Sequence, residues 1–407
     1  MKIVEINAFA DGSTGNIMMQ IAKRARQLQQ KAITFSTIVF SVKGVPQKQH
    51  IPEHHYFSSY IENFIHYSLA QCTDGNGLFS VFATIRLIKQ IKKIKPDILQ
   101  LHNLHEYCIS FPLLFRYIRK ERINTVWTFH DCWAFTGHCM HFDYAECERW
   151  KTGCGKCRQK HINPRCRVER SRYLWQKKKK CFTSADTLTI VTPSEWLAGL
   201  VRQSFLQSFP VKVIHNGIDT EVFSPVKSDF REKNRLTDKH IVLGVASDWG
   251  VMKGLDVFVK MSCDLKETYK VVLIGVDEAL EKQLPANIYC IRRTQDKHEL
   301  ASIYTAADVF ANPTREDTFP TVNIEALACG TPVVTYNTGG SPEILDKTCG
   351  SVVNKDDYLS FMKEIIRICE EKPYQKDNCI KRAEQFRAEN SYNEYISLYE
   401  RIYGGSL

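Results

Sequence analysis

Two carboxylates, Asp317 and Glu325, lie eight residues apart in the segment NPTREDTFPTVNIEALACGTPVV, which spans residues 312–334. The apolar run that leads into it predicts a strand, and Pro320 predicts the first turn of a helix. Backbone N–H groups at a helix start are unpaired and bind phosphate. Asp317, outside the helix, could accept hydrogen bonds from sugar hydroxyls, and Glu325, further inside it, could bind a ribose diol. The spacing indicates a sugar-nucleotide site, although a helix-capping acid and an unrelated surface acid give the same pattern.

The residues between the two acids would form the phosphate-binding part of this site. Thr318, Phe319 and Thr321 surround the N–H groups at the predicted helix start, and Glu316 stands beside Asp317. The small residues that follow, in EALACGTPVV, would keep the helix close to a sheet. The surface-acid interpretation leaves these small residues unexplained.

Two glycine-containing turns could bring further groups to a phosphate. In DGSTG, the residues Gly12, Ser13, Thr14 and Gly15 lie where a first strand turns into a helix. Such a turn lets backbone N–H groups approach a phosphate, although a simple tight turn explains the same residues. In GVASDWGVMKGLDVF, Lys253 precedes the next predicted helix. It could reach a diphosphate beyond the strand ends, or it could be an ordinary surface lysine.

A cysteine cluster occupies residues 137–161. Cys139, Cys147, Cys154 and Cys157 follow a C-x7-C-x6-C-x2-C spacing, with three histidines nearby. Four thiolates suit a tetrahedral structural zinc ion that would hold together a loop too polar to form its own core. The first two cysteines are farther apart than in common zinc sites, so a thiol-rich loop without metal is the alternative.

The elements that must position these residues alternate between strand and helix. Predicted strands are 2–9, 33–40, 97–103, 125–131, 187–194, 240–247, 269–276, 288–294, 308–314 and 332–337; predicted helices are 15–30, 79–95, 109–121, 254–265, 297–307, 320–329 and 384–403. Several strands are apolar on both faces, which is typical of parallel sheets covered by helices. Two successive sets of this alternation predict two doubly wound, Rossmann-like α/β domains.

Chain length also favours two domains, since 407 residues exceed what one core usually supports. We expect an N-terminal domain over 1–209, a nucleotide-sugar-binding domain over 210–385, and a C-terminal helical stretch, 386–407, that could cross back to the first domain. Residues 41–80 and 132–165 carry no readable motif, and we expect them to be loops. If the protein transfers a sugar, these loops would select the acceptor molecule.

Composition and charge indicate the cellular compartment and the kinds of binding partner to expect. No apolar run reaches the length of a membrane-spanning helix, and the first residues contain Glu5 where a signal peptide would be apolar, so a cytoplasmic protein is expected. Residues 1–212 contain 31 Lys and Arg against 15 Asp and Glu, a net charge of +16, whereas the remainder carries −6. A basic half could face anionic lipid at the inner side of the cell membrane or could be a solvated surface.

Several stretches taken together resemble the retaining GT-B glycosyltransferases of family 4. They are PDILQLHNLH, TFHDCWAF, VTPSEWLAGLVRQSF, VIHNGIDTEVFSP, the segment around Glu325 and GGSPEIL, in the family's order and over nearly the whole chain. The resemblance implies a GT-B fold, two Rossmann-like domains facing across a cleft, and catalysis that requires no cofactor. It places Gly12 to Gly15 near the donor diphosphate and His130 near the donor sugar.

The resemblance also implies roles in the second half. Lys253 would neutralise the diphosphate leaving group, Glu325 would hold the ribose, and Asp317 would take the place of the family's first glutamate at the donor sugar. This chain departs from the family in having Asp317 there, with Glu316 adjacent, and Asp248 where an arginine five residues before the lysine is common. Arg292, Arg293 or Arg315 could supply the missing charge.

The function expected from these features is transfer of a sugar from a UDP- or GDP-linked donor to a saccharide acceptor, lipid-linked, in bacterial exopolysaccharide, O-antigen or capsule assembly. Rival functions are a zinc-containing nucleic-acid-binding protein, a non-catalytic sugar-nucleotide-binding module and a sugar-nucleotide epimerase of the same fold. The acidic second half and the absence of a recognition element in the sequence argue against nucleic acid.

Overall fold

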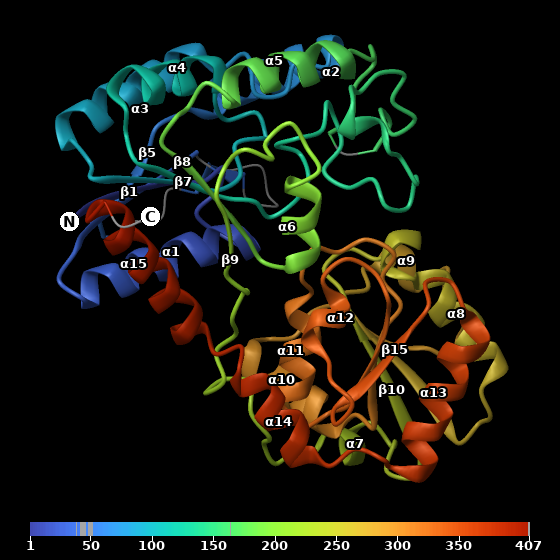
Figure 1. Cartoon of the computed structure of the whole chain (residues 1–407). Coiled ribbons are helices and arrows are strands. Elements are labelled where there is room, and N and C mark those ends of the chain that lie inside the picture. Colours follow the sequence, from blue (N-terminus) through green and yellow to red (C-terminus); the bar gives the residue numbers. More distant parts are fainter. Residues whose placement is uncertain (38, 41–45, 48–51, 163, 406–407) are drawn as a thin grey trace. The chain divides into compact units, whose positions relative to one another are not determined.

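The computed structural model describes residues 1–37, 39–40, 46–47, 52–162 and 164–405, and it divides into two compact units (Figure 1). The first unit comprises Met1–Ile214 and Tyr392–Leu407, and the second comprises His215–Ser391. Parts of the expected acceptor loops (41–45, 48–51 and 163) and the last two residues lie outside the described residues. None of the helices in the described part of the chain has the length and apolar character needed to cross a bilayer.

The first unit is built on a seven-stranded parallel sheet of order β5-β2-β1-β6-β7-β8-β9. The strands are β1 (Lys2–Ile6), β2 (Lys31–Ser36), β5 (His54–Tyr56), β6 (Ile98–Leu101), β7 (Thr125–Thr128), β8 (Leu188–Thr192) and β9 (Val211–Val213); β3 (Val39–Phe40) and β4 (Pro46–Gln47) form a separate antiparallel pair. The central strands are buried on both faces, as their mostly apolar sequences predict.

Helices cover both faces of this sheet (Figure 1). They are α1 (Gly12–Gln27), α2 (Tyr60–Thr73), α3 (Val81–Ile94), α4 (Phe111–Glu121), α5 (Ser171–Phe182), α6 (Glu195–Val201) and the single 3-10 turn η1 (Arg149–Lys151). Helix α2 lies in the region 41–80, where only loop was expected. Its start is set by a capping box, in which Ser59 and Glu62 bond each other's backbone N–H groups.

The second unit is built on a six-stranded parallel sheet of order β12-β11-β10-β13-β14-β15. Its strands are β10 (His240–Val245), β11 (Tyr269–Ile274), β12 (Tyr289–Ile291), β13 (Val309–Asn312), β14 (Val333–Tyr336) and β15 (Gly350–Val353). Its helices are α7 (Phe230–Lys233), η2 (Val251–Lys253), α8 (Leu255–Asp264), α9 (Glu278–Glu281), α10 (Lys297–Ala306), α11 (Thr321–Ala328), α12 (Ser341–Ile344), α13 (Tyr358–Glu371) and α14 (Lys376–Glu384). Separate apolar clusters on the two faces of the sheet hold these helices.

The final helix, α15 (Ala388–Tyr403), begins in the second unit and continues in the first. Its buried aromatic residues pack with apolar residues of α1 and the first sheet. The Tyr399 hydroxyl donates to Gln100 Oε1 at 2.9 Å, and the Tyr395 hydroxyl lies 3.1 Å from Thr128 Oγ1. The aromatic stripe that the sequence shows on this helix is therefore part of the first unit's core.

Candidate functional site

The strand order of the second sheet places two sequence-predicted residues at one point. The chain runs outward from β10 to β11 and β12, then returns to add β13 on the other side of β10. Ligands bind beyond the carboxyl ends of parallel strands where the order reverses in this way. Lys253 follows β10 and Asp317 follows β13, so both lie at this reversal.

Lys253 and Asp317 contact each other directly. Lys253 Nζ donates to Asp317 Oδ2 at 2.7 Å, with 39% of the lysine side chain and 21% of the aspartate side chain exposed. Gly254, at φ +73°, ends the turn η2, and a Cβ there would lie 2.5 Å from the Pro313 carbonyl oxygen. The close approach of these two turns holds the lysine against the aspartate.

The start of α11 differs in one detail from the expectation. The helix begins at Thr321, with Pro320 as its N-cap, close to where the sequence predicts it. The N–H group of Phe319, expected to be unpaired, donates to Asp317 Oδ1 at 3.2 Å. The Phe319 ring is buried and stacks on His215, with ring centroids 4.9 Å apart. Phe319 is thus a core residue whose N–H group is engaged by Asp317, which corrects the prediction of a free donor.

Glu325 lies on α11 and bonds a residue that the sequence analysis missed. The hydroxyl of Tyr304, on α10, donates to Glu325 Oε2 at 3.2 Å. Burial raises the pKa of Glu325 to about 7, although the Tyr304 hydrogen bond and the charge of Lys297 oppose this shift. A carboxyl group with such a pKa changes its charge near neutral pH. Tyr304 sits in a generic helical stretch, so no sequence signal marks it.

The glycine loop after β14 packs against the backbone of Asp317. Gly339 has φ +56°, and a Cβ at this position would lie 1.6 Å from the Asp317 carbonyl oxygen. Only glycine fits there without moving the aspartate. Glu316 is held through its backbone, since the Thr314 hydroxyl donates to the Glu316 carbonyl at 3.1 Å.

Two of the arginines considered as replacements for the family's arginine are held by carboxylates. Arg315 is 7% exposed and binds Asp256 through two nitrogens, at 2.7 and 2.8 Å, and Asp356 through a third, at 2.6 Å. Arg292 pairs with two glutamates near α9 on the surface. Arg315 therefore joins the turn η2, helix α8 and the end of β15, and its charge is balanced by two acids.

In the first unit, the predicted glycine turn lies at the carboxyl end of β1. Gly12 starts α1 at φ +70°, and a Cβ on Gly15 would lie 2.5 Å from the carbonyl carbon of Ala10. Asn7 Nδ2 donates to Thr14 Oγ1 at 3.1 Å, and Asn7 Oδ1 accepts from the Asn103 N–H. These contacts hold the start of α1, including Ser13, against the end of the sheet.

His130, just after β7, lies in a buried row of titratable side chains. Its Nε2 is 3.1 Å from His102 Nδ1, and His102 Nε2 is 3.3 Å from Glu5 Oε2. Burial lowers the pKa of His130 to about 4, so its imidazole is neutral at pH 7. His102 lies within a motif that resembles the family, but its sequence position alone indicates no role, and Glu5 is notable in the sequence only as a charge where a signal peptide would be apolar.

A second buried pair lies beside this row. His105 Nε2 bonds Asp131 Oδ2 at 2.7 Å. Burial opposes protonation of His105, but the carboxylates of Asp131 and Glu106 outweigh it and raise its pKa to about 10. His105 is therefore a cation at neutral pH, next to the neutral His130, and both line a small pocket at the carboxyl ends of β6 and β7.

The four predicted zinc ligands also come together in the first unit. Cys139, Cys147, Cys154 and Cys157 line one pocket, which is walled by Phe142 and Trp150 among others. All four are free thiols, and the side chains of Cys139 and Cys157 are hydrogen-bonded to each other. The spacing in sequence thus brings the four sulfurs to one cavity.

Comparison with known proteins relates both units to one group of enzymes. Residues 21–222 match the family described as Glycosyltransferase Family 4, and residues 226–386 match the family described as Glycosyl transferases group 1. A curated relative, the putative colanic acid biosynthesis glycosyl transferase WcaC of Escherichia coli K12, is 26% identical over 276 residues, and the match covers 66% of each chain.

Solved structures share the fold over almost the whole length. Sucrose-phosphate synthase from Thermosynechococcus elongatus superposes with a TM-score of 0.68 at 17% identity and covers all of both chains. Anabaena HepE in complex with UDP-glucose superposes with a TM-score of 0.65 at 14% identity and covers 98% of both. The predicted GT-B architecture and the family resemblance are confirmed. The chain belongs to the group 1 glycosyl transferases of glycosyltransferase family 4 and has their GT-B fold.

Proposed function

We propose that this protein transfers a sugar, with retention of anomeric configuration, from a UDP- or GDP-linked donor to a saccharide acceptor. The observation that carries the proposal is the meeting of Lys253 and Asp317 at the strand-order reversal of the second sheet, at the start of the helix that presents Glu325. In the complex that we propose, Lys253 binds the diphosphate, Asp317 the sugar hydroxyls and Glu325 the ribose.

The geometry suggests how the leaving group is stabilised. Departure of a nucleoside diphosphate concentrates negative charge on its oxygens, and Lys253 is half-exposed and can turn toward them. The lysine then exchanges Asp317 for the diphosphate, which leaves the Asp317 carboxylate able to accept hydrogen bonds from the sugar. Retention would follow from attack on the face that the diphosphate leaves. The family resemblance supports this stereochemistry, and the acceptor-side chemistry is assigned to the first unit, near His130.

We also propose that the acceptor is lipid-linked and serves polysaccharide assembly at the inner face of the cell membrane. The relationship to WcaC, whose name refers to colanic acid, supports the polysaccharide part. Exposed apolar side chains on α2 and α3 support the lipid part: Ile61, Phe64 and Ile65 on the first helix, and Phe82, 75% exposed, and Ile85 on the second.

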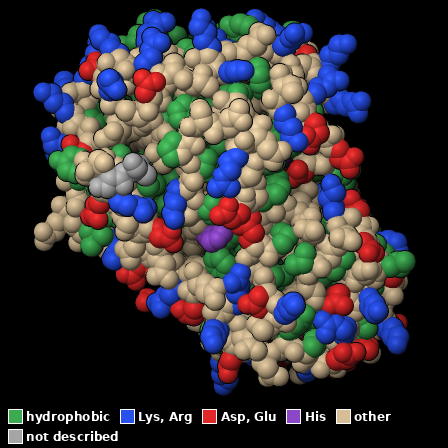
Figure 2. All heavy atoms as spheres, in the orientation of Figure 1, with side chains coloured by type: hydrophobic (Ala, Val, Ile, Leu, Met, Phe, Trp, Pro, Cys, Tyr) green, Lys and Arg blue, Asp and Glu red, His purple; other side chains and the backbone are tan. Residues whose placement is uncertain are grey.

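Basic residues flank this apolar surface. Arg86, Lys89, Lys92 and Lys93 are exposed on α3, and Figure 2 shows Lys and Arg side chains spread over the face of the first unit that carries α3, α4 and α5. Apolar side chains inserted among basic ones bind bilayers that contain anionic lipid. Arg86 also pairs with Glu62, so the two helices form one continuous surface.

A vesicle experiment tests the membrane contact. We expect the protein to pellet with phosphatidylglycerol vesicles and much less with phosphatidylcholine vesicles, because each basic residue near an anionic surface adds attraction. The double variant F64S/F82S should lose most of this binding, whereas L359S should keep it, because Leu359 is at least as exposed as either phenylalanine but lies in the second unit. Equal pelleting with both lipids, or with both variants, contradicts the proposal.

The donor assignment is tested by thermal stability. Because a ligand that binds only the folded state raises the melting temperature, a panel of UDP- and GDP-linked hexoses should contain members that raise it by several degrees. The corresponding nucleoside monophosphates, which lack the diphosphate, should have little effect. Product analysis with and without acceptor then separates transfer from epimerisation, which needs no acceptor. Stabilisation by no nucleotide sugar in the panel would overturn the assignment.

A further inference from the structure

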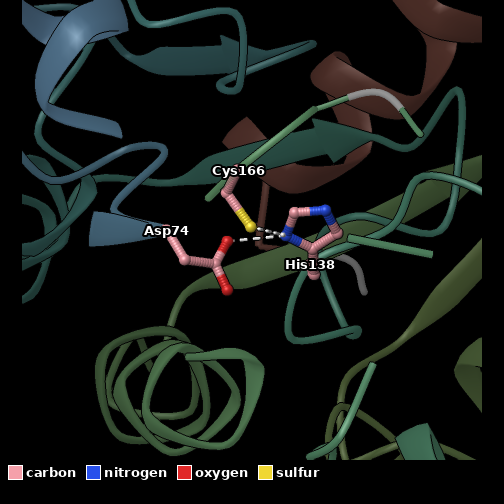
Figure 3. A group of neighbouring side chains, drawn as sticks. All are labelled: Asp74, His138 and Cys166. Atoms are coloured by element: carbon pink, nitrogen blue, oxygen red, sulfur yellow. Dashed lines mark hydrogen bonds and ion pairs between the residues drawn. The ribbon is translucent and has the colours of Figure 1, made fainter. Parts of the chain in front are cut away.

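The cysteine-rich loop contains a buried histidine, His138, with a carboxylate at one ring nitrogen and no partner among the described residues at the other. His138 precedes Cys139 and is 2% exposed. As Figure 3 shows, its Nδ1 faces Asp74 Oδ1 at 2.6 Å and Cys166 Sγ at 3.9 Å. Asp74 is the C-cap of α2, and its second oxygen accepts the Arg170 N–H at 2.8 Å. Three separate segments of the chain thus meet at this imidazole.

Asp74, His138 and Cys166 could be taken as a metal site in their own right. The separation of 2.6 Å between Nδ1 and Oδ1 argues against it. Two ligands bound tetrahedrally to zinc at about 2.0–2.1 Å lie roughly 3.3 Å apart. A distance of 2.6 Å is that of a hydrogen bond to a carboxylate, so Nδ1 is the protonated nitrogen and Asp74 is its acceptor.

The other ring nitrogen of His138 is consequently an acceptor. Nε2 is buried, and among the described residues it has no hydrogen-bond partner. A buried polar atom without a partner costs free energy. An imidazole that donates one N–H to a carboxylate while its second nitrogen is deprotonated is the arrangement in which histidine binds a metal ion.

Three of the cluster's thiols share a pocket with this histidine, although their sulfurs and Nε2 do not all lie within 4.8 Å of one another. His138 lines the pocket formed by the cysteine cluster. The side chains of Cys139 and Cys157 are hydrogen-bonded, and the backbone N–H of Gly137, one residue before His138, donates to Cys154 Sγ at 3.1 Å. Cys147 lines the same pocket. The described part of the loop contains little regular structure apart from the turn η1, so few backbone hydrogen bonds hold it together.

We propose that His138 Nε2 and the thiolates of Cys139, Cys154 and Cys157 bind one Zn²⁺ ion, and that Asp74 orients the histidine from behind. Nitrogen and sulfur ligands in a closed set of four suit a structural zinc site. Binding releases the three thiol protons to solvent while the imidazole stays neutral. The assignment replaces Cys147 of the sequence-derived set by His138, and it does not depend on the proposed transferase activity.

Metal analysis of the full-length protein tests this site. Protein purified under reducing conditions should contain about one zinc per chain, and C157S and H138A should lose it. C166S and C147S are the matched controls and should retain it, since neither residue is a ligand in this assignment. D74N should weaken zinc binding by about 10–100-fold, measured against a competing chelator, because Asp74 acts through the histidine.

Alkylation of the wild-type chain gives a second measurement that does not depend on any variant folding. Peptide mapping should show Cys139, Cys154 and Cys157 protected from iodoacetamide until a chelator is added, while Cys147 reacts throughout. Zinc-free protein with all of these thiols reactive overturns the proposal. Loss of zinc in C147S with retention in H138A, or loss in C166S, also overturns it, in favour of a four-thiolate site or of the Asp74–His138–Cys166 group respectively.

Discussion

Replacement of Lys253 by alanine is expected to lower the turnover number for sugar transfer by about two to three orders of magnitude. The lysine ammonium is the positive charge placed at the strand-order reversal, where the departing diphosphate would lie. Its contribution grows as charge develops on the leaving group, so kcat should fall more than donor affinity. Steady-state kinetics with the donor that the thermal-shift panel selects would measure both quantities.

The variant K253A should remain folded. The Lys253–Asp317 pair is partly exposed, and such pairs contribute less than about 1 kcal/mol to the free energy of unfolding. The matched control is K260A, on α8, where the exposed lysine pairs with Asp264 one helical turn away. K260A should transfer sugar at the wild-type rate. A K253A enzyme that retained more than about a tenth of the wild-type kcat would show that the diphosphate binds elsewhere.

Replacement of Glu325 by glutamine is expected to weaken donor binding by about 100-fold. A hydrogen bond from a neutral hydroxyl to a carboxylate contributes about 1.5–3 kcal/mol, and the amide of glutamine retains the shape but not the charge. Calorimetric titration with the nucleotide sugar would measure the change. E371Q, at the exposed end of α13, is the control and should bind the donor normally.

The pH dependence distinguishes Glu325 from a residue that only shapes the helix. With its pKa near 7, Glu325 is increasingly protonated below neutral pH, so the affinity for donor should fall by about tenfold per pH unit below 7. The diphosphate of a nucleotide sugar is esterified at both ends and keeps its charge in this range. E325Q should bind with an affinity independent of pH, and a wild-type affinity that is flat from pH 5 to 8 would contradict the ribose assignment.

The free energy of unfolding should change with pH in the opposite direction to the donor affinity. The folded state holds the Glu325 proton more tightly than the unfolded chain, because burial raises the pKa of this carboxyl group. The stabilisation is complete below the unfolded pKa, near 4.5, and is lost as the pH rises through about 7. Wild-type protein without donor should therefore lose stability relative to E325Q across this interval, even as its donor affinity increases.

Much of the fold was predictable because parallel sheets leave a direct signature in sequence. Strands buried on both faces are mostly apolar, and the helices between them show their own period, so the segments that became β6, β7, β10, β11, β13 and β14 could be recognised without a structure. Helix α2 was missed although Ile61, Phe64 and Ile65 follow helical spacing. In the structure this apolar stripe is exposed and does not pack on the sheet.

The residues of the candidate site can also be sorted into those that the sequence marks and those that it does not. Asp317, Glu325 and Lys253 could be chosen from sequence because loops that follow strands carry ligand groups in this kind of sheet. Tyr304, His102 and the Asp74–His138 pair could not, since each gains its role from a residue far away in the chain. The same applies to Phe319, whose ring packs on His215 in the core.

The sequence alone determined the parallel α/β architecture, the family and the residue types able to bind a diphosphate, because local residue spacing and the apolar pattern encode them. Only the tertiary structure decided that Lys253 contacts Asp317, that Arg315 is neutralised by two acids, and that one ring nitrogen of His138 is buried with no partner among the described residues. The physical reason is that hydrogen-bond partners, burial and charge balance depend on distances between segments far apart in the sequence. Those distances are set by the strand order of the folded sheets.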